Sequence, residues 1–124
     1  MTIPRRSNDT NAEALFGQLR LDKGSWASRA AEVQPKAAQA YARLLTIAET
    51  SDTGQAGRVA RFIASSFNVA AHHFDLFDLR SLDVPISDDI LMCLDALRWG
   101  KADLYKLVPD GEKRVKNVID LWSF

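Results

Sequence analysis

The sequence predicts an all-α fold, a single compact domain of about five to six helices around a buried, irregular connector at residues 74–86. Apolar residues recur at steps of three and four in several separate segments, which gives each helix one buried face. No segment keeps the strict alternation that is typical of a half-buried strand. A chain of 124 residues, 47% hydrophobic and 26% charged, suits one globular domain with its own core.

The first part of the chain has the least regular pattern. Residues 1–11 are polar, so we expect a flexible N-terminal arm ahead of a single helical domain at 12–124. Residues 12–21 fit a short helix or a strand, and we favour the helix. Gly24 and Ser25 interrupt the apolar pattern, and Ser25 is predicted to cap a second short helix.

Two regular helices are predicted at about 36–49 and 54–68, joined by a polar turn. Pro35 fits the first turn of the earlier helix, where its missing N–H costs nothing. The predicted buried stripes are Ala38, Tyr41, Leu44, Leu45 and Ala48 in the first helix, and Ala56, Val59, Ala60, Ile63 and Phe67 in the second.

The connector combines large apolar residues with aspartates. Burying each large apolar side chain is worth about 1.5–3 kcal/mol, so the connector is expected to lie against the core. Asp75 or Asp78 is predicted to cap a short helical turn there, because aspartate is favoured at helix starts. The apolar residues concerned are Phe74, Leu76, Phe77, Leu79 and Leu82.

Helical segments are also predicted after the connector. Ser87, following Pro85, is expected to be the N-cap of a helix that stops before Gly100. A short turn is expected within 101–108, and Pro109-Asp110-Gly111 is expected to open the last helix. The predicted buried faces are Ile90, Leu91, Leu94 and Leu97 in the earlier helix, and Val115, Val118, Ile119 and Trp122 in the last.

Composition limits the compartment and the partners. Sixteen basic and sixteen acidic residues give no net charge, which disfavours a general polyanion binder and leaves self-association open. The single cysteine, Cys93, cannot form an intrachain disulfide and is expected to be a small buried residue in a reducing compartment. No apolar run reaches the roughly 20 residues of a membrane helix, and no signal peptide is evident. We therefore expect a cytoplasmic, bacterial-type protein without membrane association.

Motifs for catalysis are missing from the sequence. His72 and His73 are adjacent, so on a helix their side chains diverge by about 100°, and the metal-binding His-Glu-x-x-His spacing is absent. Phosphate-binding loops, dinucleotide fingerprints and nucleophile elbows are absent as well. Ser65, Ser66 and Cys93 have no evident base partner. The sequence thus predicts no enzyme, no cofactor and no metal.

Two binding hypotheses remain. The first is a protein interaction module, with a protein partner or a second copy in a homodimer, that binds through Arg58, Arg61, Arg98 and Trp99. The alternative is a DNA-binding accessory protein in which the two helices at 36–49 and 54–68 form a helix-turn-helix-like pair. Gln55, Arg58 and Arg61 would then read bases. Acidic residues near these helices would repel phosphate, so nucleic acid is not favoured.

Several short stretches also carry a family resemblance. They are Ile47-Ala48-Glu49, Gly54-Gln55-Ala56 with Arg58-Val59-Ala60, Asn68, the run Phe74 to Leu79, the segment Asp83 to Asp89, and the closing Val118 to Trp122. With these stretches, residues 44–122 resemble a proteobacterial domain family of unknown function associated with integrative and conjugative elements. The resemblance implies a helical accessory or regulatory module of a mobile element. It supplies no catalytic or binding residue.

Overall fold

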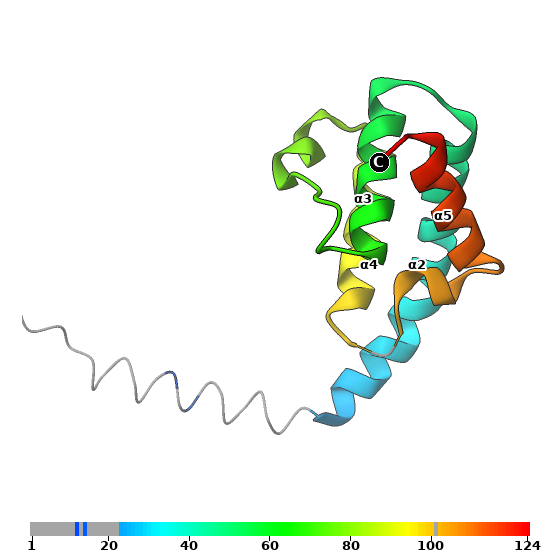
Figure 1. Cartoon of the computed structure of the whole chain (residues 1–124). Coiled ribbons are helices and arrows are strands. Elements are labelled where there is room, and N and C mark those ends of the chain that lie inside the picture. The colour runs from blue at the N-terminus through cyan, green and yellow to red at the C-terminus, as the bar shows by residue number, and fades with distance from the viewer. Residues whose placement is uncertain (1–11, 13, 15–22, 101) are drawn as a thin grey trace, which may run out of the picture.

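The computed structural model describes residues 12, 14, 23–100 and 102–124, and these residues form an all-α fold (Figure 1). Four α-helices, two 3₁₀-helices and no strand occur in this part of the chain, as predicted. The predicted arm at 1–11 lies outside the described residues, as does most of the predicted helix at 12–21. The elements are α2 (Lys23–Thr50), α3 (Gly54–Phe67), η1 (Leu76–Ser81), α4 (Val84–Leu97), η2 (Leu104–Leu107) and α5 (Gly111–Leu121).

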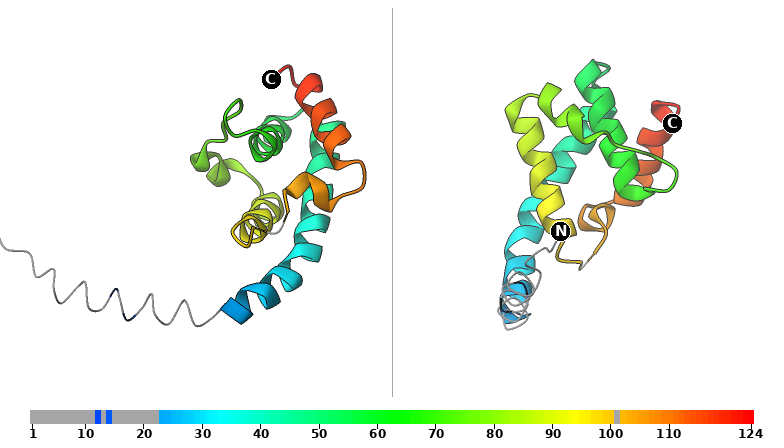
Figure 2. Two further views of the ribbon diagram at one scale, coloured as in Figure 1. Left: turned by 60° about the horizontal axis from the view of Figure 1, so that its bottom comes forward. Right: turned by 90° about the vertical axis from the view of Figure 1, so that its left-hand side faces the viewer.

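Helix α2 is the element on which the others pack. It contacts α3, α4, α5 and η2, mainly along its C-terminal half, while its N-terminal half extends beyond the bundle (Figures 1 and 2). Before residue 37, Ala30 is its only buried residue among the described side chains. The core joins side chains from five elements: Tyr41, Leu44, Leu45, Val59, Ile63, Ile90, Leu104, Val115 and Val118, all almost fully buried.

The predicted start of a helix at residue 36 is wrong, because α2 runs without interruption from Lys23 through Pro35 to Thr50. A proline inside a helix removes one N–H donor and leaves the carbonyl four residues earlier without its partner. Both Pro35 and Ala31 are exposed, so water can reach the carbonyl that loses its bond. The expected interruption at Gly24 and Ser25 is likewise not observed.

The turn between α2 and α3 is confirmed, and the predicted stripe of α3 is buried except for Phe67, which is partly buried. Thr53 caps α3, and its hydroxyl oxygen accepts a hydrogen bond from the Ala56 N–H at 3.2 Å. At the other side of the turn, the Trp122 indole N–H donates to the Ala48 carbonyl at 2.9 Å. That carbonyl is one of the four that every helix leaves without an internal partner. The same indole also packs against Gly57, so α5 holds the two ends of the turn in place.

The connector departs from prediction. Asp75 does cap η1, since its carboxylate accepts the Phe77 N–H at 2.9 Å. However, Leu76 and Phe77 are both 69% exposed, and of the connector's large apolar residues only Leu82 is buried. A 3₁₀-helix has three residues per turn, so a two-turn segment can turn only one face to the core. Leu76 and Leu79 share that face, but only Leu79, in the second turn, and Leu82, which follows η1, pack against the core.

Helix α4 begins four residues earlier than predicted, since its N-cap is Asp83 rather than Ser87. Pro85 lies in the first turn, where its missing N–H has no cost. Ser87 is inside the helix and donates its hydroxyl to the Val84 carbonyl at 3.0 Å. The predicted cap at Ser87 is therefore wrong, because Pro85 belongs to the first turn of the helix and does not precede its start.

The buried face of α4 also differs from the predicted stripe. It consists of Ile90, Cys93 and Ala96, whereas Leu91 is 52% exposed. Small residues line the contact with α2, where the Cys93 sulfur lies 4.0 Å from the Ala37 carbonyl oxygen. Close approach of two helices favours small side chains at the contact, so Leu91 and Leu97 are exposed and Leu94 is only partly buried. Cys93 is buried, as predicted.

The short turn at η2 and the last helix are confirmed. Gly111 starts α5 at a point where an added Cβ would lie 1.8 Å from the Tyr105 carbonyl oxygen, so no other residue fits without a shift of the backbone. Asp110 precedes it with φ of 56°, in the left-handed region. Val115 and Val118 are buried, and Ile119 and Trp122 are partly buried against the core.

Candidate functional site

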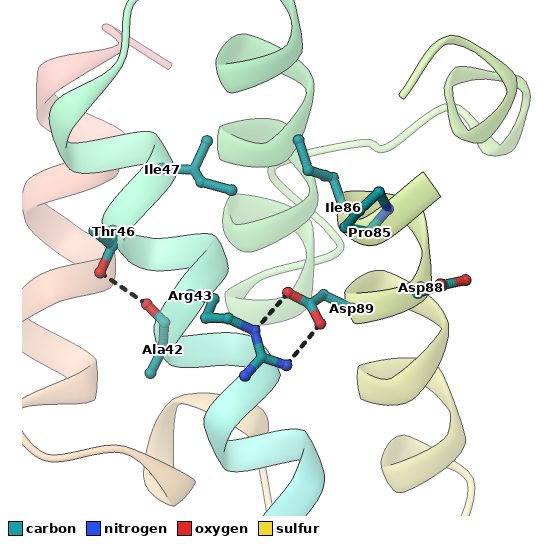
Figure 3. Close-up of a pocket in the computed structure, with 8 residues that line it drawn as sticks. All are labelled: Ala42, Arg43, Thr46, Ile47, Pro85, Ile86, Asp88 and Asp89. Carbon is teal, nitrogen blue, oxygen red and sulfur yellow. Dashed lines mark hydrogen bonds and ion pairs between the residues drawn. The ribbon is translucent and has the colours of Figure 1, made fainter. Parts of the chain in front are cut away.

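A groove of about 750 Å³ lies between α2 and the N-terminal half of α4 (Figure 3). Ile47 of α2 and Ile86 of α4 point toward one another across it. On the α2 wall, the small side chains of Ala42 and Thr46 leave space beside Ile47 and Arg43. The lining residues are Ala42, Arg43, Thr46, Ile47, Pro85, Ile86, Asp88 and Asp89.

An ion pair bridges the groove below the two isoleucines. The Arg43 guanidinium donates from Nε to Oδ2 of Asp89 at 2.9 Å and from Nη2 to Oδ1 at 2.8 Å. The hydrogen bond to Asp89 raises the pKa of Arg43 above its ordinary value. Because Arg43 is largely exposed, the pair contributes little stability and mainly fixes the position of both side chains.

Asp88 adds an uncompensated negative charge at the rim. Its carboxylate is exposed and has no hydrogen-bond or ion-pair partner among the described residues. The groove therefore carries one positive and two negative side chains around an apolar floor. This arrangement can accept apolar side chains in the middle and a basic group at the edge.

The residues predicted to bind lie elsewhere, in two separate places. Arg58 and Arg61 are on α3, where Arg58 Nε lies 3.8 Å from the Asp78 carboxylate. Arg98 and Trp99 lie at the end of α4, where Arg98 pairs with Asp95 at 2.6 Å. No hydrogen bond, ion pair or ring contact in the described part of the chain joins the two places, and neither lines the groove.

Trp99 forms a small aromatic cluster with the projecting part of α2. Its ring packs edge-to-face against Trp26 at 5.3 Å, and the guanidiniums of Arg29 and Arg98 lie over it at 5.7 and 4.5 Å. The Trp99 indole N–H is buried without a hydrogen-bond partner in the described chain. This cluster holds the end of α4 against α2.

The residues of the predicted DNA-reading face are largely occupied by internal contacts. The Gln55 side chain donates to the Asp83 carboxylate at 3.1 Å and accepts the Asp83 N–H at 2.7 Å. Arg58 faces Asp78. Two acidic residues of the connector thus lie against this face of α3, and only Arg61 has no partner in the described structure.

The nucleophiles considered from the sequence are also engaged. Burial raises the pKa of the Cys93 thiol to about 12. The hydroxyls of Ser65 and Ser66 donate to the carbonyls of Phe62 and Ile63. In the described ranges, no group of three or more histidine, cysteine, aspartate or glutamate residues could hold a metal ion. No described helix is long and apolar enough to cross a membrane.

Sequence reasoning did not find the groove. Its two walls come from helices far apart in the chain, and nothing in the sequence pairs Arg43 with Asp89. One signal was present: Ile47 is a large apolar residue outside the predicted stripe of its helix. An apolar residue off the buried stripe indicates either a second contact or an exposed binding surface.

Comparison with family models matches residues 38–123 to a family of unknown function, DUF7673. The chain belongs to this family. All residues that line the groove fall within the matched range, whereas the projecting half of α2 precedes it. The match carries no activity and no association with mobile elements. The chain matches no curated protein and no solved structure.

Proposed function

We propose that this DUF7673 domain is a non-enzymatic protein interaction module whose groove between α2 and α4 binds an amphipathic helix with a basic residue. The observation that carries the proposal is the apolar floor between Ile47 and Ile86, with the unpaired carboxylate of Asp88 at the outer rim on α4. A helix laid along two others can place apolar residues at steps of three and four into such a groove. A lysine or arginine beside them would meet Asp88.

The non-enzymatic part of the proposal is supported by the state of the nucleophiles. Cys93 remains a buried thiol, and the two serine hydroxyls donate to helix carbonyls. The resemblance to a family associated with integrative and conjugative elements supports a regulatory or accessory role in a mobile element. The partner would then be another protein of that element.

A display library of helical peptides, selected against the domain, tests the groove directly. We expect the selected peptides to share apolar residues at steps of three and four with a neighbouring basic residue, and to shift the amide NMR signals of Ile47 and Ile86. Ile86→Lys should weaken their binding at least tenfold. Leu121→Lys, which changes an exposed apolar residue of α5, is the matched control and should leave it unchanged.

Asp88→Lys provides the test of charge. This variant should bind the basic peptides more weakly, whereas the Leu121→Lys control should bind them with unchanged affinity. Binding that shifts signals outside the groove, or that is equally strong in Ile86→Lys, would contradict the proposal. Circular dichroism of each variant establishes that its helices are retained.

The same variants identify the natural partner and separate it from DNA. Tagged protein is used to capture partners from host extracts with and without nuclease. A protein whose capture survives nuclease and the Leu121→Lys change, but is lost with Ile86→Lys, supports the proposal. Material lost with nuclease and with Arg61→Ala would instead favour the alternative of a DNA-binding accessory protein.

A further inference from the structure

A second, smaller pocket of about 220 Å³ lies away from the groove, beside α3. Asn68 ends α3, and its carbonyl accepts the N–H groups of Ala71 and His72 at 3.2 and 3.0 Å. This tight turn brings the chain back along α3, so the two histidines lie next to Arg61. The lining residues are Arg61, Ala64, Ala71, His72, His73 and Phe124.

Arg61 is the one arginine in the described chain that has neither an ion-pair partner nor an aromatic ring beneath it. The others are engaged: Arg43 with Asp89, Arg58 with Asp78, Arg98 with Asp95 and Arg114 with Glu49, while Arg29 and Arg80 lie over Trp99 and Phe77. A guanidinium has five N–H donors in a planar fork. Arg61 lines the pocket, and no hydrogen bond or ion pair to the described residues occupies its donors.

The other walls of the pocket add donors and no negative side chain. The imidazole rings of His72 and His73 make no hydrogen bond to the described residues, so their ring nitrogens are uncommitted. The nearest acids in sequence are used elsewhere, because Asp75 caps η1 and Asp78 faces Arg58. Phe124, whose ring lies 6.3 Å from that of His72, forms an apolar wall.

We propose that this pocket binds a small phosphate-bearing anion, either free phosphate or a phosphate monoester. Arginine binds phosphate through two parallel N–H···O bonds, and imidazole N–H groups can donate to the remaining oxygens. The pocket is smaller than the roughly 300–1,000 Å³ of sites for drug-sized ligands, which suits a single phosphate group. None of the residues that line the pocket has an acidic side chain to repel the phosphate.

A titration with inorganic phosphate at constant ionic strength tests the site. The NMR signals of the His72 and His73 rings report the binding. Chloride is the reference anion. We expect saturable shifts in the natural protein and at least tenfold weaker binding in Arg61→Ala. Arg80→Ala removes another exposed arginine outside the pocket and should bind phosphate as the natural protein does. His72→Ala and His73→Ala should each give a smaller loss.

Two further ligands determine the source of the phosphate. Glycerol 3-phosphate that binds more tightly than phosphate would identify a monoester site. A single-stranded oligonucleotide that binds through Arg61 when neither small anion binds would overturn the proposal in favour of nucleic acid. Phosphate binding that is unchanged in Arg61→Ala, or that fails to saturate, would overturn it as well.

Discussion

The paired helices α2 and α3 and the connector that follows them are both rich in large apolar residues, yet they place them differently. Leu44, Leu45 and Ile63 are fully buried, whereas Leu76 and Phe77 are more than two thirds exposed. The helices are 28 and 14 residues long and present a continuous face to their neighbours. The six residues of η1 present only one short face. Burial therefore depends on the regular structure that carries a side chain as well as on its hydrophobicity.

The contrast also bears on function. The apolar stripe of a folded helix is buried in the core. The exposed apolar residues of the connector remain at the surface, where a partner can contact them. Val84, also strongly exposed, is the first residue of α4 and directly precedes Pro85 and Ile86 of the groove. The connector thus leaves apolar surface exposed immediately before the groove in sequence, whereas the groove itself is formed by two regular helices.

The largest expected difference between the two regions is in stability. Leu45→Ala should lower the free energy of unfolding by about 2–5 kcal/mol, because it leaves a cavity among fully buried residues. Phe77→Ala should lower it by no more than about 1 kcal/mol, since only an exposed contact with Arg80 is lost. Urea unfolding measures both. Equal losses would show that the connector is buried in solution, as the sequence predicted.

Alkaline pH should destabilise the core through its buried titratable groups, whereas the apolar residues of the connector do not titrate. Burial raises the pKa of Cys93 from 9.0 to about 12, and it raises the pKa of Tyr41 as well. Above pH 9 the unfolded chain loses the thiol proton while the folded chain keeps it. Stability should therefore fall as pH rises from 9 toward 12, by at most about 1.4 kcal/mol per pH unit for each group.

Cys93→Ala isolates the contribution of the thiol to that slope. Urea unfolding at a series of pH values should give a shallower decline in the variant, with the part due to Tyr41 remaining. Identical slopes in the two proteins would mean that the thiol titrates alike in the folded and unfolded chains. It would then not be buried in solution.

The smallest expected effect concerns the attachment of the connector to the core. Gln55→Ala removes both hydrogen bonds to Asp83 and should cost about 0.5–1.5 kcal/mol. Hydrogen exchange of the Asp83 amide should become faster, because that N–H loses its acceptor, while amides of α5 stay protected. Gln39→Ala on the exposed side of α2 is the control. Unchanged exchange at Asp83 would contradict this attachment.

The sequence predicted the helices well where local signals agree with one another. The stripe of α3, the cap at Asp75 and the start of α5 near Gly111 all follow from short-range rules. The predictions at the start of α4 and at Pro35 were wrong because each of these sequence patterns is compatible with two different local structures. Asp83 and Ser87 are both good caps, and a proline fits the first turn as well as an exposed helix interior.

Which face of α4 is buried could not be decided locally either. Leu91 and Cys93 both belong to apolar stripes of helical period, and leucine is the more hydrophobic choice. The approach of α2 selects the small residue, since the Ala37 carbonyl lies beside the Cys93 sulfur. The leucine is left at the surface.

By itself, the sequence determined the all-α class and the positions of most helices, because helical period and turn residues act within a few positions of the chain. Only the tertiary structure decided the two candidate sites. Arg43 and Asp89 are 46 residues apart, and the groove exists because α2 and α4 bring them together. Likewise, Arg61 differs from the other arginines that the structure describes in having no partner, and the partners of those arginines depend on how the helices pack.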